Sequence, residues 1–75
     1  MSLVEVAWGA NEIEAEIAAG ALRASGLHPR VAPDPRSAHL AYAGALTRGP
    51  AIVLVPESEA DAARAIVRAP RRRRR

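Results

Sequence analysis

A chain of 75 residues has room for one domain, and the absence of cysteine excludes disulfide bonds and thiolate chemistry. Its core must be thin, because there is no phenylalanine and a domain of this size buries only about 60% of the surface of its unfolded chain. The net charge of +3 arises from Arg71 to Arg75, which contribute +5 and leave −2 for the remainder of the chain.

No apolar run approaches the ~20 residues that a transmembrane helix needs. Glu5 also stands where a signal peptide would have basic and then apolar residues. We therefore expect a soluble cytoplasmic protein with no membrane partner. Self-association into a dimer or trimer is one way to stabilise so small a core, and we expect it here.

A first strand is predicted over residues 3–8. Residues 4, 6 and 8 are all apolar, whereas the residues between them include Glu5. This period of two is typical of a half-buried strand. One side of this strand carries Val4, Val6 and Trp8. We therefore expect Trp8 to lie in the core rather than in a contact with a partner.

A helix is predicted from Glu12 to about Ser25. Asn11 is a good N-cap, and Glu14 follows it three residues later, as in a capping box. At the other end, Gly26 can adopt the left-handed conformation that closes many helices. These local signals place both ends of the helix.

The predicted helix is apolar on two sides. At about 100° per residue, one face is shared by Ile13, Ile17, Gly20, Ala21 and Ala24. Small residues on this face would let the helix lie close to a sheet. The roughly opposite side carries Ala15, Ala18 and Leu22, and it is either ordinary surface or a strip that contacts a partner.

A second strand is predicted over residues 27–32, where Pro29 limits it to the edge of a sheet. The connection from Asp34 to Gly49 that follows is the least regular part of the chain. Connections of this length are uncommon inside a small domain and are often functional. We expect this connection to carry the contacts with a partner.

The stretch from Pro50 to Val67 organises the rest of the chain. Ala51 to Val55 is an uninterrupted aliphatic run rich in β-branched residues, which predicts a buried central strand. Pro56 ends that strand, and acidic residues then open a second helix that ends near Arg68. The face of this helix that we expect to be buried consists of Ala60, Ala63, Ile66 and Val67.

These elements predict an α+β domain over residues 1–69, with the order β-α-β-β-α. The sheet is expected to be antiparallel, with both helices on one face. Pro70 stops the second helix, and residues 70–75 are expected to form a disordered tail because five consecutive arginines repel one another.

The order of these motifs resembles the small bacterial "putative signal transducing protein" family, formerly a domain of unknown function. The resemblance spans residues 3–67 and rests on Asn11-x-Ile13-Glu14-Ala15, Leu22, Gly26-Leu27 and Val53-Leu54-Val55-Pro56-Glu57. It implies a ferredoxin-like fold akin to the nitrogen-regulatory PII proteins, in which the long connection between the second and third strands contacts partners. Asp34 to Gly49 occupies that place here. Pro70 and the arginines stand where such a fold has its fourth strand, so a sheet without this strand is an open alternative.

The sequence favours a protein that is not an enzyme and has no cofactor. A zinc site needs three or four clustered ligands, and His28 and His39 are the only histidines. We expect His28 to be a surface residue. The glycine-rich stretch at residues 44–49 lacks the lysine of a phosphate-binding loop.

The best candidates for binding a small effector or a partner protein lie in the 34–49 connection. They are Arg36, His39, Tyr42 and Arg48. Two arginines can grip an anion, and tyrosine offers a ring and a hydroxyl group. The predicted function is therefore a regulatory or signal-transducing module that binds through residues 34–49.

Nucleic-acid or other polyanion binding through Arg71, Arg72, Arg73, Arg74 and Arg75 is the alternative function. Arginines in a flexible tail can neutralise phosphates, and contact with phosphates alone carries no information about base sequence. We therefore expect any such binding to be non-specific.

Overall fold

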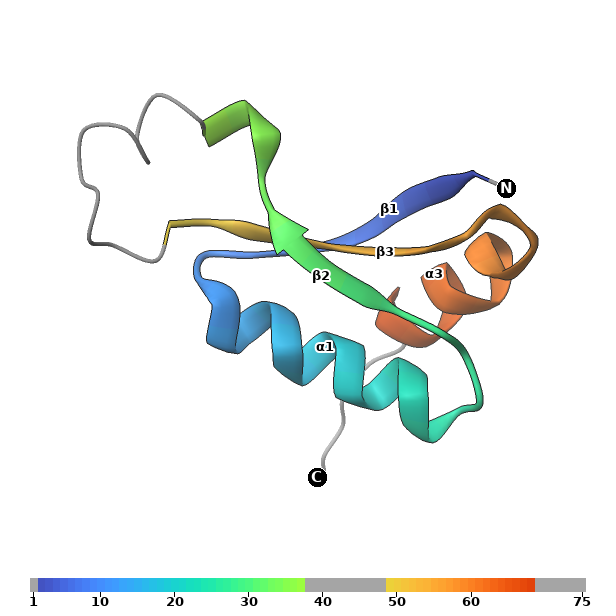
Figure 1. The fold of residues 1–75 in the computed structure, drawn as a ribbon. Helices are drawn as coiled ribbons and strands as arrows, with labels where there is room; N and C mark the ends of the chain where they lie inside the picture. Colours follow the sequence, from blue (N-terminus) through green and yellow to red (C-terminus); the bar gives the residue numbers. More distant parts are fainter. Residues whose placement is uncertain (1, 38–48, 69–75) are drawn as a thin grey trace.

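The structure is a computed structural model, and it describes residues 2–37 and 49–68. Along the chain the elements are β1 (Leu3–Gly9), α1 (Glu12–Ala24), β2 (Arg30–Pro33), the 3-10 turn η1 (Pro35–Ser37), β3 (Ala51–Pro56), the 3-10 turn η2 (Glu57–Glu59) and α3 (Ala60–Arg68). The three strands form an antiparallel sheet in the order β1-β3-β2, and both helices cover one face of it (Figure 1). This arrangement confirms the predicted β-α-β-β-α fold.

β3 is the central strand, as its aliphatic composition predicts. Ala51, Val53 and Val55 point into the core between the sheet and the helices, and each is at most 3% exposed. Ile52 and Leu54 alternate with them and point to the opposite face of the sheet. Neither α1 nor α3, the helices of the described ranges, covers this face, and we call it the helix-free face. That second face carries the candidate site described below.

The ends of α1 are set by the local signals that the sequence contains. The side chain of Asn11 accepts a hydrogen bond from the backbone N–H of Glu14 at 2.9 Å, and the Glu14 carboxylate accepts one from the N–H of Ala10 at 2.9 Å. At the other end Gly26 has φ +88°, and the N–H of Leu27 donates to the carbonyl of Leu22 at 3.0 Å. These bonds form a Schellman motif, as we expected from Gly26.

The prediction of which face of α1 is buried was wrong. Leu22 is 0% exposed and lies in the core with Ala15 and Ala19, whereas Ile13 is 71% exposed and Ile17 is 65% exposed. The Schellman motif explains this orientation, because it brings Leu27 next to Leu22 and Leu27 packs against the core. The alanines let α1 approach the sheet closely.

The prediction that Trp8 lies in the core was also wrong, and a β-bulge is the reason. The pairing of β1 with β3 shifts between Glu5 and Ala7, so one extra residue, Val6, is inserted. Val4, Val6 and Ala7 pack against the core, and the alternation then resumes in the opposite phase. Trp8 therefore points to the helix-free face, where it is 54% exposed.

α3 completes the covered side of the sheet. Ala60 and Ala63 are buried as predicted, and Val67, which we expected to be buried, is 39% exposed. Glu59, just before α3, holds the connection between α1 and β2 in place. Its carboxylate accepts a hydrogen bond from the backbone N–H of His28 at 2.8 Å and lies 2.6 Å from His28 Nδ1.

Candidate binding site on the helix-free face

The candidate site is organised by Asp34, which follows β2 and is 5% exposed. Its Oδ1 accepts hydrogen bonds from the backbone N–H and from Nε of Arg36, both at 2.9 Å. Its Oδ2 accepts one from Nε1 of Trp8 at 2.8 Å. A buried carboxylate is tolerated when it is paired and hydrogen-bonded in this way. Asp34 therefore joins the end of β2 to the end of β1.

Arg36 links the same carboxylate to β1. In addition to its bond with Asp34, its Nη2 donates to Glu5 Oε2 at 3.0 Å. The pKa of Arg36 is raised by its hydrogen bonds, first to Asp34 and then to Glu5. The Arg36 side chain is nevertheless 64% exposed, so a fixed positive charge is presented to solvent.

Trp8 lies beside this pair on the same face of the sheet. It is in register with Ile52 of β3, which in turn is in register with Ala32 of β2. Residues directly opposite in an antiparallel sheet point to the same side, so these three form one row across the helix-free face. The hydrogen bond to Asp34 fixes the indole ring, which keeps an exposed aromatic surface in one orientation.

The arrangement presents two side chains that suit binding. Both oxygens of Asp34 accept hydrogen bonds, so this carboxylate holds Trp8 and Arg36 in place. Tryptophan and arginine are the residue types that contribute most to protein–protein affinity, especially when they are held in place before the partner arrives. Trp8 and Arg36 meet both conditions.

Asp34 and Glu59 should make the stability of the domain depend on pH under acidic conditions. The side-chain hydrogen bond from Arg36 is the main cause that lowers the pKa of Asp34 below its ordinary value of 3.8, and burial opposes it. The hydrogen bond with the His28 side chain is the main cause that lowers the pKa of Glu59 below 4.5.

A carboxyl group with a lowered pKa in the folded state stabilises that state at pH values above its unfolded pKa. This contribution is lost as the pH falls from 4.5 and 3.8 through the lowered values of Glu59 and Asp34. We expect the free energy of unfolding, measured with urea, to decrease over this acidic range. The decrease should be smaller in an Asp34→Asn variant, and an unchanged decrease would contradict the role of Asp34.

Of the four residues that the sequence predicted for the site, Arg36 belongs to the cluster. His39, Tyr42 and Arg48 lie outside the described residues, as do Arg71 to Arg75. Glu5, Trp8 and Asp34 were missed. The sequence holds one signal for Asp34. An aspartate directly after a strand often accepts a hydrogen bond from the backbone N–H two residues later, in an Asx-turn, and Arg36 donates this bond here.

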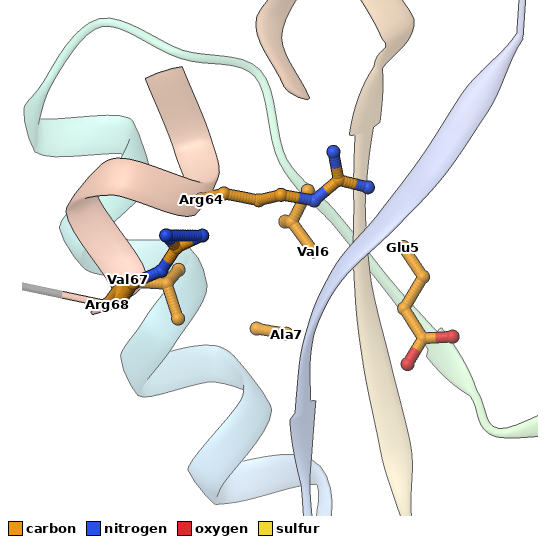
Figure 2. A pocket seen from close by; sticks show the side chains of 6 residues that line it. All are labelled: Glu5, Val6, Ala7, Arg64, Val67 and Arg68. Carbon is orange, nitrogen blue, oxygen red and sulfur yellow. The ribbon is translucent and has the colours of Figure 1, made fainter. Parts of the chain in front are cut away.

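A second surface is a shallow groove of about 460 Å³ on the other side of β1. It is lined by Glu5, Val6, Ala7, Arg64, Val67 and Arg68. Figure 2 shows Arg64 reaching from α3 towards β1 above Val6 and Ala7, whereas the carboxylate of Glu5 points away from α3. Among the described residues, neither Arg64 nor Arg68 forms an ion pair. The groove therefore adds positive charge near the end of α3.

Comparison with known proteins identifies the family of the chain. A family model described as "Putative prokaryotic signal transducing protein" matches residues 3–70, which confirms the resemblance seen in the sequence. No curated protein and no solved structure matches the chain. In the two described ranges, no helix is long and apolar enough to cross a bilayer.

Proposed function

The chain belongs to this family of prokaryotic signal transducing proteins, and on that premise we propose that it is a non-enzymatic module that binds a partner protein. Its binding surface is the helix-free face around Trp8 and Arg36, together with the adjoining segment 34–49. The partner reads or transmits a signal through this contact. A small effector that binds the same face is the other form of this function.

One observation carries the proposal. A buried carboxylate, Asp34, holds an exposed tryptophan and an exposed arginine on a sheet face that neither α1 nor α3 covers (Figure 1). Exposure of a large apolar ring to water is unfavourable, and Trp8 is 54% exposed, which supports a role for the ring in contact with a partner. The hydrogen bonds that Asp34 accepts from Trp8 and Arg36 stabilise this arrangement, although they require a charged carboxylate to be buried.

The chemistry of the face indicates what the partner presents. The ring of Trp8 suits an apolar pocket, and the Arg36 guanidinium suits a carboxylate or phosphate at the border of that pocket. Arg36 already contacts Glu5 and Asp34, so a partner anion would compete with Glu5 for it. Binding is therefore expected to weaken with increasing salt.

Trp8 allows a direct test, because it is the only tryptophan of the chain. Nucleotides, metabolites and protein fractions from the native host are titrated while tryptophan emission and thermal stability are recorded. A ligand of this face should shift the emission of Trp8 to shorter wavelength and raise the melting temperature. An Arg36→Ala variant should bind that ligand about tenfold or more weakly.

Arg64→Ala is the matched control, because Arg64 is an exposed arginine on the other side of β1. It should bind as tightly as the unmodified chain. A partner that binds the unmodified chain and the Arg36→Ala variant with equal affinity, and leaves Trp8 emission unchanged, would refute this face as the site. A response to a protein fraction alone would assign the site to a protein partner.

The alternative function, non-specific binding of nucleic acid through Arg71 to Arg75, is favoured by the two arginines of the groove, Arg64 and Arg68. Full engagement of five arginines on duplex DNA would give a salt slope of about −4.5. The same titration with a labelled duplex, comparing the full chain with one that ends at Pro70, separates this function from the first. Equal binding by both chains would show that Arg71 to Arg75 do not contribute to binding of the duplex.

A further inference from the structure

The outer side of α1 carries an apolar stripe that nothing in the described part of the molecule covers. The stripe consists of Ile13, Ile17, Gly20 and Ala24, spaced four, three and four residues apart. This is the spacing of the contact seam in a coiled coil. It lies opposite the buried face of Ala15, Ala19 and Leu22, so the stripe points directly away from the sheet.

The exposure of the two isoleucines is large for a domain of this size. Ile13 is 71% exposed and Ile17 is 65% exposed, although the core has few large residues with which to stabilise the fold. Large side chains that the fold leaves in water next to each other mark an interaction surface. The identity of the partner follows from the shape and charge of the stripe.

We propose that this stripe binds the same stripe of a second copy of the chain, with the two α1 helices antiparallel. In this arrangement Ile13 lies over Ala24 of the partner subunit, and Ile17 lies over Gly20 of the partner subunit. Each large residue meets a small one, and two-fold symmetry repeats both contacts. The half of the helix that bears isoleucines fits the half that bears small residues.

Gly20 provides the space for this contact. A Cβ atom added at Gly20 would meet nothing within 4 Å in the single chain, so the position is open on its outer side. Glycine in the middle of a helix is less favourable than alanine. In the dimer, glycine at this position leaves room for the partner's Ile17 to approach the helix closely, whereas nothing in the described part of the isolated domain requires a glycine there.

The charges beside the stripe favour the same orientation. Glu16 and Arg23 lie along one flank, about half exposed, with Glu16 Oε1 and Arg23 Nη1 3.9 Å apart. In the antiparallel pair, Glu16 comes beside Arg23 of the partner subunit, and the symmetry-related contact pairs Arg23 with Glu16 of the partner subunit. A parallel pair would instead set isoleucine against isoleucine and glycine against glycine, and would leave gaps.

This inference does not depend on the proposed function. The stripe is on the side of α1 that faces away from the sheet. The helix-free face that carries Trp8, called the Trp8 face from here on, is on the other side of the sheet. A dimer through α1 therefore leaves both Trp8 faces free. The two proposals can fail separately.

Sedimentation equilibrium of the full chain over a range of concentrations tests the proposal. We expect a reversible dimer, which Ile17→Ala weakens by about tenfold or more because it removes most of a buried isoleucine side chain. Gly20→Leu should abolish the dimer while the single chain stays folded, because the position is open and leucine favours the helix. Circular dichroism checks the folding of both variants.

A charge exchange tests the orientation. Glu16→Arg alone would place two arginines together in the antiparallel dimer and should weaken it. Combining Glu16→Arg with Arg23→Glu should restore the dimer, since the pair is then reversed but still complementary. A parallel dimer would not be rescued in this way.

Three outcomes would overturn the proposal. A chain that stays monomeric at all concentrations would show that a second copy does not cover the stripe. A dimer that persists in Gly20→Leu would place the interface elsewhere. A dimer that the double charge exchange fails to restore would exclude the antiparallel contact.

Discussion

A Leu22→Ala variant is expected to lose a large part of the stability of this domain. Leu22 is 0% exposed and is one of the largest fully buried side chains. Truncating a buried leucine costs about 2–5 kcal/mol, and at about 0.05–0.15 kcal/mol per residue a domain of this length is stable by only roughly 4–11 kcal/mol. Urea unfolding followed by circular dichroism measures the loss.

Ile17→Ala on the same helix is the matched control. Ile17 is 65% exposed, so in solution dilute enough to keep the chain monomeric its truncation should change the free energy of unfolding by less than about 0.5 kcal/mol. The contrast separates the two apolar sides of α1. If Ile17→Ala were the more damaging change in dilute solution, the orientation of the helix described here would be wrong.

A Gly9→Ala variant should also be strongly destabilised, although it adds only a methyl group. A Cβ atom at Gly9 would lie 2.7 Å from the backbone nitrogen of Ala15 and 2.9 Å from Cβ of Glu14. The first turn of α1 would have to move away from the end of β1. Overpacking of this kind costs typically about 1–3 kcal/mol, and thermal unfolding would show it as a lower melting temperature.

Gly20→Ala should stabilise the domain, whereas Gly9→Ala should destabilise it, so the two variants form a direct comparison. Its added Cβ meets nothing within 4 Å, and alanine favours a helix by roughly 1 kcal/mol over glycine. In solution dilute enough to keep the chain monomeric, we expect a higher melting temperature for Gly20→Ala and a lower one for Gly9→Ala. Equal effects of the two changes would mean that β1 and α1 do not approach each other as closely as the structure shows.

The two proposals together describe a way in which so small a module can act. A dimer through α1 would carry two Trp8 faces, one on each subunit and each turned away from the dimer contact. A partner with two matching surfaces would then bind with an effective concentration set by the spacing of these faces. A signal that changes the dimer would change partner binding without altering the Trp8 face itself.

The sequence by itself determined the elements and their order, because the signals for them are local. The aliphatic run Ala51 to Val55 predicted the central strand, Asn11 and Glu14 the start of α1, and Gly26 its end. Each of these signals acts within a few residues of the chain, through hydrogen bonds and allowed backbone angles. The family match, over residues 3–70, covers the same elements.

Only the tertiary structure decided which apolar residues are inside and which residues form the site. α1 has two apolar sides, and the close fit of the alanine side against the sheet, with Leu22 beside Leu27, selects one of them. The bulge at Val6 turns Trp8 to the helix-free face. The bonds from Asp34 to Trp8 and from Arg36 to Glu5 join residues 26 and 31 positions apart, and only folding brings such residues together.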